Sequence, residues 1–108
     1  MTNAIDTRTE NQRYRCQTID WNGFAVEVRY CPDWSRIGAE TLAHLEIVSP
    51  DRAALPVTAT GYRSHFCMAL SVEDAGGPAA YARMMLDEAA RSAEWIEREL
   101  AARQLALF

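Results

Sequence analysis

The dipeptide Asn22-Gly23 lies between two runs of alternating apolar and polar residues, and it constrains the fold more than any other feature. Both central residues of a type I′ turn need a positive φ, which Asn and Gly tolerate best. A two-residue loop here places Trp21 opposite Phe24, Ile19 opposite Val26 and Gln17 opposite Val28. We therefore predict an antiparallel hairpin whose apolar face carries Ile19, Trp21, Phe24, Val26, Val28 and Tyr30. Its polar face carries Cys16, Thr18, Asp20, Glu27 and Arg29.

The segments after the hairpin predict further strands. Cys31-Pro32-Asp33 is expected to end the second strand, because proline cannot donate to a neighbouring strand. Residues 41–48 are predicted as a third strand, with Ala43, Leu45 and Ile47 on one face and Leu42, His44, Glu46 and Val48 on the other. Residues 57–60 are predicted as a short fourth strand at the edge of the sheet, and residues 61–66 as irregular.

The last third of the chain has helical signals. Residues 71–74 have the spacing of an N-cap serine with an acid at the third helical position, and Gly76-Gly77 should end that short helix. Pro78 suits the first turn of a second helix, and Ser92 either caps a third helix or marks a kink. We predict an α+β fold: a three- to four-stranded antiparallel meander followed by C-terminal helices packed on one face. Residues 1–12 are expected to be a flexible arm, residues 13–103 a single domain and residues 104–108 a peptide tail.

Composition narrows the classes of function. The chain has 108 residues with a net charge of −4, and its 11 basic residues are all arginines scattered among acids, so we expect no direct binding to nucleic acid. It has no apolar run of the roughly 20 residues that a membrane span needs, and its N-terminus lacks the apolar core of an export signal. Three widely separated cysteines do not describe a disulfide scaffold. A cytoplasmic protein without a membrane partner is the expectation, and its oligomeric state is open.

The metal-ligating and nucleophilic side chains are few: Cys16, Cys31, Cys67, His44 and His65. No pair has the close spacing of a zinc knuckle or of a metalloprotease helix, so we expect no metal and no cofactor. His65 and Cys67 would share a face on an extended segment, but no neighbouring motif activates either one. We therefore expect a protein that is not an enzyme, with a His65–Cys67 enzyme as the weakest alternative.

Residues 62–66 form a dense polar and aromatic run between the expected strands and helices. Functional residues concentrate on such connections, so Tyr62, Arg63, Ser64 and His65 are secondary candidates for a binding site. The alternative is structural: Tyr62 and Phe66 anchor the core, while Arg63 and His65 satisfy nearby carbonyls and acids.

Several runs carry a resemblance: Trp21-Asn-Gly-Phe, Glu27-Val-Arg-Tyr30, Pro32-Asp-Trp34, Ala43-His-Leu-Glu-Ile47, residues 60–66, Gly76-Gly-Pro78 and residues 103–108. Together they resemble a group of small uncharacterised proteins of alphaproteobacterial chromosomes and plasmids. This resemblance implies a bacterial setting, with a mobile element as one possibility, and implies no catalytic residue.

The end of the chain, Gln-Leu-Ala-Leu-Phe at residues 104–108, resembles the peptide Gln-Leu-(Ser or Asp)-Leu-Phe with which replication and repair factors bind the bacterial β sliding clamp. Gln104, Leu105, Leu107 and Phe108 match, and Ala106 departs. The resemblance implies that the Leu-Phe pair enters an apolar pocket while the glutamine amide binds at its rim. The alternative is that Leu100, Leu105, Leu107 and Phe108 end an amphipathic helix that packs on the sheet.

Two hypotheses follow. The first is a non-enzymatic interaction protein whose tail binds the sliding clamp of DNA replication. The second is a mobile-element accessory or inhibitor protein that binds another protein through its sheet or through residues 62–66.

Overall fold

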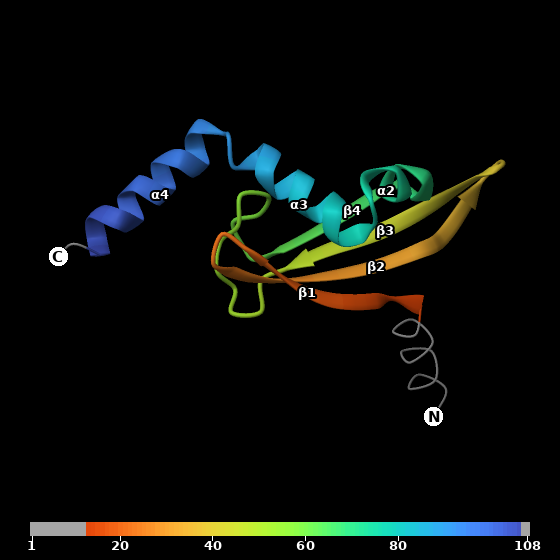
Figure 1. Cartoon of the computed structure of the whole chain (residues 1–108), viewed down its shortest axis with the longest axis horizontal. Coiled ribbons are helices and arrows are strands. Elements are labelled where there is room, and N and C mark those ends of the chain that lie inside the picture. The colour runs from red at the N-terminus through yellow and green to blue at the C-terminus, as the bar shows by residue number, and fades with distance from the viewer. Residues whose placement is uncertain (1–12, 107–108) are drawn as a thin grey trace, which may run out of the picture.

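The computed structural model describes residues 13–106, which form a four-stranded antiparallel sheet followed by three helices (Figure 1). The sheet has the order β1-β2-β3-β4. The elements are β1 (Arg15–Trp21), β2 (Phe24–Ile37), β3 (Glu40–Val48), β4 (Tyr62–Met68), α2 (Ala69–Ala75), α3 (Pro78–Ala89) and α4 (Ala93–Ala106). This is the predicted α+β class, with a meander sheet and the helices after it. The expected arm, residues 1–12, lies outside the described residues.

The β1–β2 hairpin has the predicted turn and the predicted pairing. Asn22 and Gly23 adopt φ values of 49° and 89°, and the Gly23 amide donates to Asp20 Oδ1 over 2.8 Å. Trp21 pairs with Phe24, Ile19 with Val26 and Gln17 with Val28. The apolar face is buried as expected, except that Phe24 is half-buried.

The expectation that β2 ends at residues 31–33 is wrong, because β2 continues to Ile37. Its pairing with β1 stops at Tyr30, and its pairing with β3 is irregular between Cys31 and Ser35. Pro32 lies within that irregularity, where no regular ladder needs its missing N–H. The strand then resumes its pairing with β3.

The fourth strand is also not where the sequence placed it. Residues 57–60 belong to a local turn in which Leu55 and Thr58 exchange backbone hydrogen bonds of 2.8 and 3.0 Å. The fourth strand is instead β4, Tyr62–Met68, which pairs with β3 along its length. It includes most of residues 61–66, which were expected to be irregular. Gly61 redirects the chain with a φ of 87°, and its carbonyl accepts from the Ser49 amide over 2.7 Å.

The helices begin and end largely where glycine and proline predict. Gly76 ends α2, and Pro78 stands in the first turn of α3. The predicted cap at Ser71 is wrong: α2 starts at Ala69, directly after β4, and Met68 at its N-cap makes no side-chain hydrogen bond. The connection from the strand therefore sets the start of α2, and Ser71 lies inside the helix.

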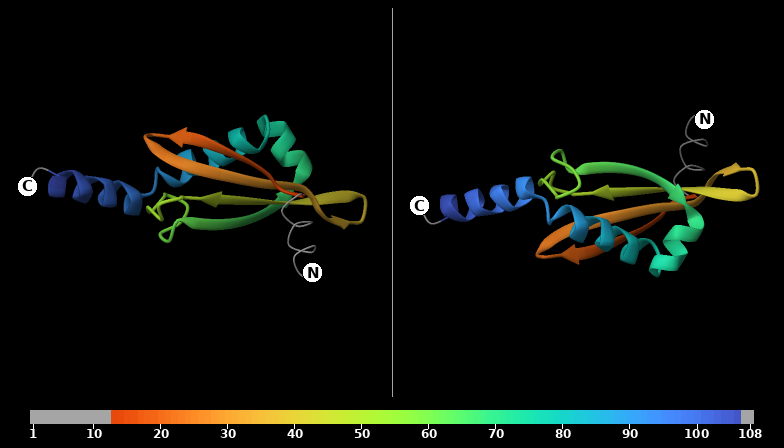
Figure 2. Two further views of the ribbon diagram at one scale, coloured as in Figure 1. Left: turned by 90° about the horizontal axis from the view of Figure 1, so that it is seen from below. Right: turned by 90° about the horizontal axis from the view of Figure 1, so that it is seen from above.

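Helices α2 and α3 lie on one side of the sheet, and α4 continues past its end (Figure 2). The core forms between these two layers, and its fully buried side chains include Val26, Val28, Leu45, Ile47, Val72 and Leu86. Two polar contacts tie α3 to the hairpin: Trp21 Nε1 donates to Asp87 Oδ1 over 2.9 Å, and Arg83 Nη1 donates to the Asp20 carbonyl over 3.0 Å.

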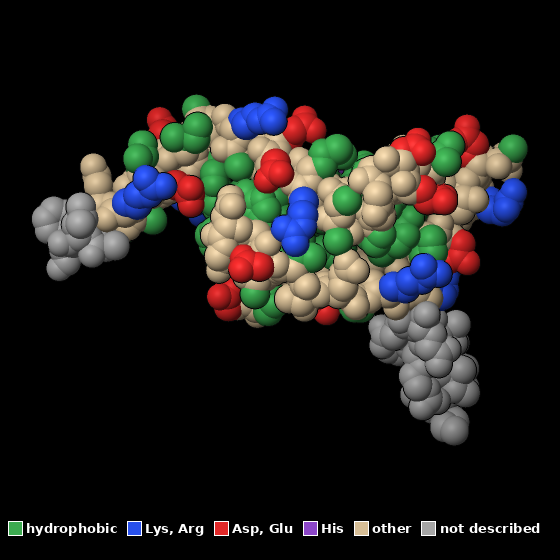
Figure 3. All heavy atoms as spheres, viewed as in Figure 1, with side chains coloured by type: hydrophobic (Ala, Val, Ile, Leu, Met, Phe, Trp, Pro, Cys, Tyr) green, Lys and Arg blue, Asp and Glu red, His purple; other side chains and the backbone are tan. Residues whose placement is uncertain are grey.

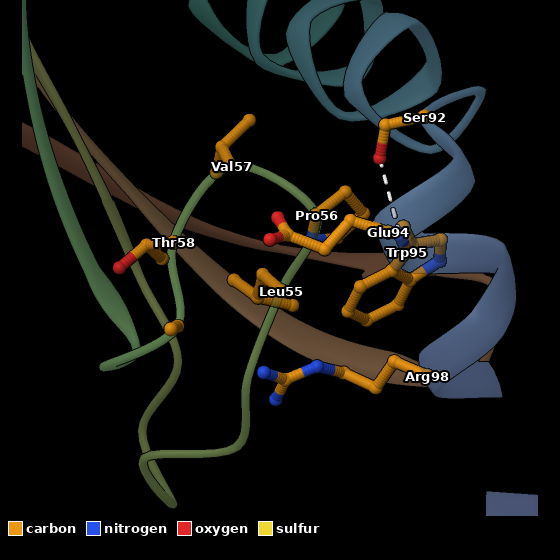
Figure 4. A pocket seen from close by; sticks show the side chains of 9 residues that line it. Leu55, Pro56, Val57, Thr58, Ser92, Glu94, Trp95 and Arg98 are labelled. Carbon is orange, nitrogen blue, oxygen red and sulfur yellow. Dashed lines mark hydrogen bonds between the residues drawn. The ribbon is translucent and has the colours of Figure 1, made fainter. Parts of the chain in front are cut away.

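Helix α4 is held to the body through its first turn (Figure 4). Trp95 is 8% exposed, and its ring lies 6.3 Å from that of Trp21 and 6.2 Å from that of Phe24. Of the two alternatives for Ser92, a cap or a kink, the structure shows the cap, since the Ser92 hydroxyl accepts from the Trp95 amide over 3.1 Å. A small pocket of about 170 Å³ separates this turn from Leu55 and the residues after it.

Candidate protein-binding face of the sheet

Alternation along the strands sends a second set of side chains to the face that α2 and α3 do not cover. We call this set the sheet patch: Tyr14, Arg29, Trp34, His44, Glu46, Tyr62, Ser64 and Phe66. Strand pairing places His44 opposite Phe66 and Glu46 opposite Ser64. Arg13 holds the chain across this face, because its guanidinium donates to the Asp33 and Trp34 carbonyls over 2.9 and 3.0 Å.

His44 is the centre of the sheet patch. It is only 7% exposed, and it contacts Tyr14 and Ser64 through its two ring nitrogens. The Tyr14 hydroxyl lies 2.6 Å from Nδ1, and the Ser64 hydroxyl lies 2.6 Å from Nε2. The tautomer of the ring decides which atom donates in each bond. These two contacts fix the orientation of the imidazole in the face.

Glu46 forms the second polar centre of the sheet patch. Arg29 Nη1 lies 2.8 Å from Glu46 Oε1, which makes an ion pair, although no N–H group in residues 13–106 is aligned for a hydrogen bond with this buried oxygen. The Tyr62 hydroxyl donates to Oε2 of the same carboxylate. The pKa of Tyr62 is raised, mainly by burial and to a smaller extent by this hydrogen bond. The charges in this part of the face are thus paired with each other.

Aromatic rings surround these polar centres and remain accessible. Trp34, Tyr62 and Phe66 are 40%, 46% and 47% exposed. The Phe66 ring stacks on His44 at a centroid distance of 4.4 Å and meets Trp34 edge-on at 4.7 Å. The Arg29 guanidinium lies over the Tyr14 ring, 5.2 Å from its centroid. The rings are therefore held in place while much of their surface faces water.

The secondary candidate residues divide between the two faces because they belong to β4. Tyr62 and Ser64 point to the sheet patch, whereas Arg63 and His65 alternate to the helical side, where His65 Nε2 lies 3.2 Å from the Tyr81 hydroxyl. The alternative that Tyr62 and Phe66 anchor the core is wrong, since both are exposed. The second hypothesis named the sheet as a binding surface, and the candidate residues included Tyr62 and Ser64, but Trp34, His44 and Glu46 were not among them. The two-residue period of a strand had already placed His44 and Glu46 on the face away from Leu45.

His65 and Cys67 do share a face, as an extended segment requires. Burial, and then the Arg63 charge, lower the pKa of His65, while burial raises the pKa of the Cys67 thiol. A raised thiol pKa reduces the fraction of the nucleophilic thiolate at neutral pH. Within residues 13–106, no three His, Cys, Asp or Glu side chains come together as a group that could hold a metal ion.

The described part of the tail belongs to α4. Gln104 and Leu105 are exposed, and Leu105 reaches 76% exposure. Leu100 is also 52% exposed, so for Leu100 and Leu105 the alternative of packing on the sheet is wrong. Leu107 and Phe108 lie outside the described residues, and their predicted role stays a prediction.

The fold and this face define a small α+β domain with one face of its sheet left open by its helices. A family model, the KlcB third domain, matches residues 14–95, and the chain belongs to this family. The match includes the whole sheet patch and ends at Trp95, so the outer turns of α4 lie beyond it. Family membership indicates a small accessory or interaction protein.

Searches of curated proteins and of solved structures found no match. Among the helices of residues 13–106, none has the length and apolar character to cross a membrane.

Proposed function

We propose that this chain is a non-enzymatic interaction domain that binds a protein partner through the sheet patch. The observation that carries the proposal is the set of exposed rings of Trp34, Tyr62 and Phe66, which stand on one open face around paired polar groups. The same proposal includes a role as an accessory or inhibitor protein of a mobile element. Of this role, family membership supports the accessory part.

The side chains of the sheet patch are of the types that dominate binding energy. Tryptophan, tyrosine and arginine are the residues most enriched among interface hot spots. Their positions are fixed by contacts within the free protein, such as the stack of Phe66 on His44. Binding therefore orders few additional rotamers, which lowers the entropic cost of association.

The charges of the sheet patch favour a protein partner over a nucleic acid. Arg29 is paired with Glu46, and the chain as a whole carries a net charge of −4. Binding to nucleic acid depends on unpaired cations that neutralise phosphates. An aromatic face with paired charges instead fits a protein surface that offers apolar side chains.

The test compares variants of the full chain that differ only in where an exposed apolar side chain is removed. Trp34→Ala and Phe66→Ala truncate the sheet patch, and Met84→Ala truncates a side chain of similar exposure, 42%, on α3. Proteins captured by the intact chain from a bacterial extract are identified, purified and titrated against each variant. We expect both patch variants to lower the affinity for the partner by about tenfold or more, and Met84→Ala to leave that affinity unchanged.

Two results would overturn this assignment. One is a partner whose affinity is the same for the intact chain and for both patch variants. The other is tight binding of a single-stranded oligonucleotide that Trp34→Ala and Phe66→Ala abolish, which would make the face a nucleic-acid site. Far-UV circular dichroism of each variant controls for loss of the fold.

A second candidate function rests on the exposure of Gln104 and Leu105 at the outer end of α4. With these residues accessible, the tail can act as a peptide ligand, and its resemblance points to the bacterial β sliding clamp. Leu107 and Phe108 would be the anchor, because their side chains offer the largest apolar area to a pocket.

This candidate is tested by titrating the intact chain against a purified sliding clamp, with a known clamp peptide as the positive control. We expect micromolar binding, about −8 kcal/mol. Leu107→Ala and Phe108→Ala should each weaken binding by about 1–3 kcal/mol, and Gln104→Ala by less. Ala106→Asp should tighten it. Absence of binding under conditions that detect the control peptide would rule the tail out as a clamp ligand.

A further inference from the structure

Helix α4 exposes an apolar stripe beside a groove in the body of the domain. Ile96 and Leu100 are 48% and 52% exposed and lie one turn apart. The groove has a volume of about 240 Å³ and runs between the β1–β2 turn and α4, with Trp21, Ile96, Leu100 and Arg103 among its lining residues. We call the groove and the stripe together the α4 groove. Figure 3 shows hydrophobic side chains among charged ones on this projecting helix.

The length and packing of α4 indicate that its outer turns need a partner. The helix has 14 residues, and an isolated helix of this size is marginal in water. Among residues 93–105, Trp95 alone is buried against the domain. The start of β1 lies at the opposite end of the sheet from α4 (Figure 1). The sequence before β1 is polar, and Ile5 is its one branched apolar residue.

We propose that the occupant of the α4 groove is a second copy of this chain, whose own α4 lies antiparallel to the first. An antiparallel pair centred on Ala101 is self-complementary, because Glu99 of each copy faces Arg103 of the other. Leu100 then lies next to the two-fold axis, and the end of each helix reaches the groove beside the partner's Trp95. The pairing forms two identical salt bridges and covers both apolar stripes.

Helical periodicity supplies a control position on the same element. Leu105 follows Ile96 by nine residues, which at about 100° per residue places it on the opposite side of α4. The proposed dimer therefore leaves Leu105 exposed to solvent and accessible to other ligands. Substitution at this position should not change the association.

The test measures the molecular mass of the full chain by sedimentation equilibrium over a range of concentrations. We expect reversible dimerisation, which Leu100→Glu weakens by about tenfold or more, because it places two carboxylates beside the axis. Leu105→Glu should leave the dissociation constant unchanged. Far-UV circular dichroism and tryptophan fluorescence confirm that each variant keeps the fold of the domain.

Charge reversal distinguishes this pairing from other dimers. Glu99→Arg and Arg103→Glu should each weaken the dimer, and the double reversal should restore it, because the opposed charges are exchanged and remain paired. A monomer at every concentration up to about the millimolar range overturns the proposal. So does a dimer that Leu100→Glu does not weaken, or one that the double reversal fails to restore.

Discussion

Two glycines with nearly the same positive φ allow the cost of that φ to be separated from the cost of a steric clash. Gly23 has a φ of 89° and Gly61 a φ of 87°. A Cβ added at Gly23 would meet no atom within 4 Å. A Cβ added at Gly61 would lie 3.0 Å from Cα and 3.2 Å from the carbonyl carbon of Arg52.

The expected magnitudes follow from these surroundings. Gly23→Ala should cost about 1–2 kcal/mol of unfolding free energy, since an L-residue disfavours the left-handed region by that amount. Gly61→Ala bears the same strain and adds about 1–3 kcal/mol for overpacking against backbone. The clash is hard to relieve, because Arg52 itself has a φ of 62° and its amide donates to the Ser49 carbonyl over 2.9 Å.

Thermal and urea unfolding, followed by tryptophan fluorescence, measure both variants. Each kcal/mol lowers the melting temperature of a domain of this size by about 4–8 °C, so Gly61→Ala should melt at least about 4 °C below Gly23→Ala. Gly23→Val should be worse than Gly23→Ala, because a β-branched residue resists a positive φ more strongly. Equal melting temperatures for the two alanine variants would show that the loop before β4 yields freely, which would refute the argument.

Three further predictions concern single side chains. Ser92→Ala should destabilise α4 by about 1 kcal/mol, because the Trp95 amide loses its cap, and a drop in far-UV helicity with temperature would reveal it. Tyr62→Phe should cost about 1.5–3 kcal/mol in urea unfolding, since the buried Glu46 carboxylate loses a donor; an unchanged midpoint would mean that water replaces the hydroxyl. Burial lowers the pKa of His65 in the folded protein, so the unfolded chain takes up the proton first and stability falls as the pH drops through about 6.5. His65→Gln should therefore lose less stability between pH 7.5 and 5.5 than the native chain, and identical losses would contradict the assignment.

Local sequence signals predicted the hairpin and three helix boundaries, at Gly76, Pro78 and Ser92, correctly. Asn22-Gly23 specifies a turn through its own φ preferences, and the turn then fixes every pair of the β1–β2 register. Pro78 and Ser92 act through their own backbone and side-chain chemistry, so they also give the correct boundaries. Each of these signals is contained within a few neighbouring residues.

The position of the fourth strand was predicted wrongly, because the two faces of β4 lie in different environments. Along β4 the helical side receives Arg63, His65 and Cys67, and the open side receives Tyr62, Ser64 and Phe66. Neither set is uniformly apolar, so no alternation of hydrophobicity marks the strand. Its pairing with β3, and the turn at Gly61, decide the structure of this segment.

The sequence by itself determined the class of the fold, the hairpin and its register, and the face of β3 that enters the core. Those features depend on residue types and on the two-residue period of a strand. Only the tertiary structure decided that Tyr14, Trp34, His44, Glu46 and Tyr62 meet on one face, because they come from separate segments that strand pairing brings together. It also decided that α4 leaves the sheet after Trp95, since that outcome depends on which surfaces the hairpin and the loop before β4 offer to the helix.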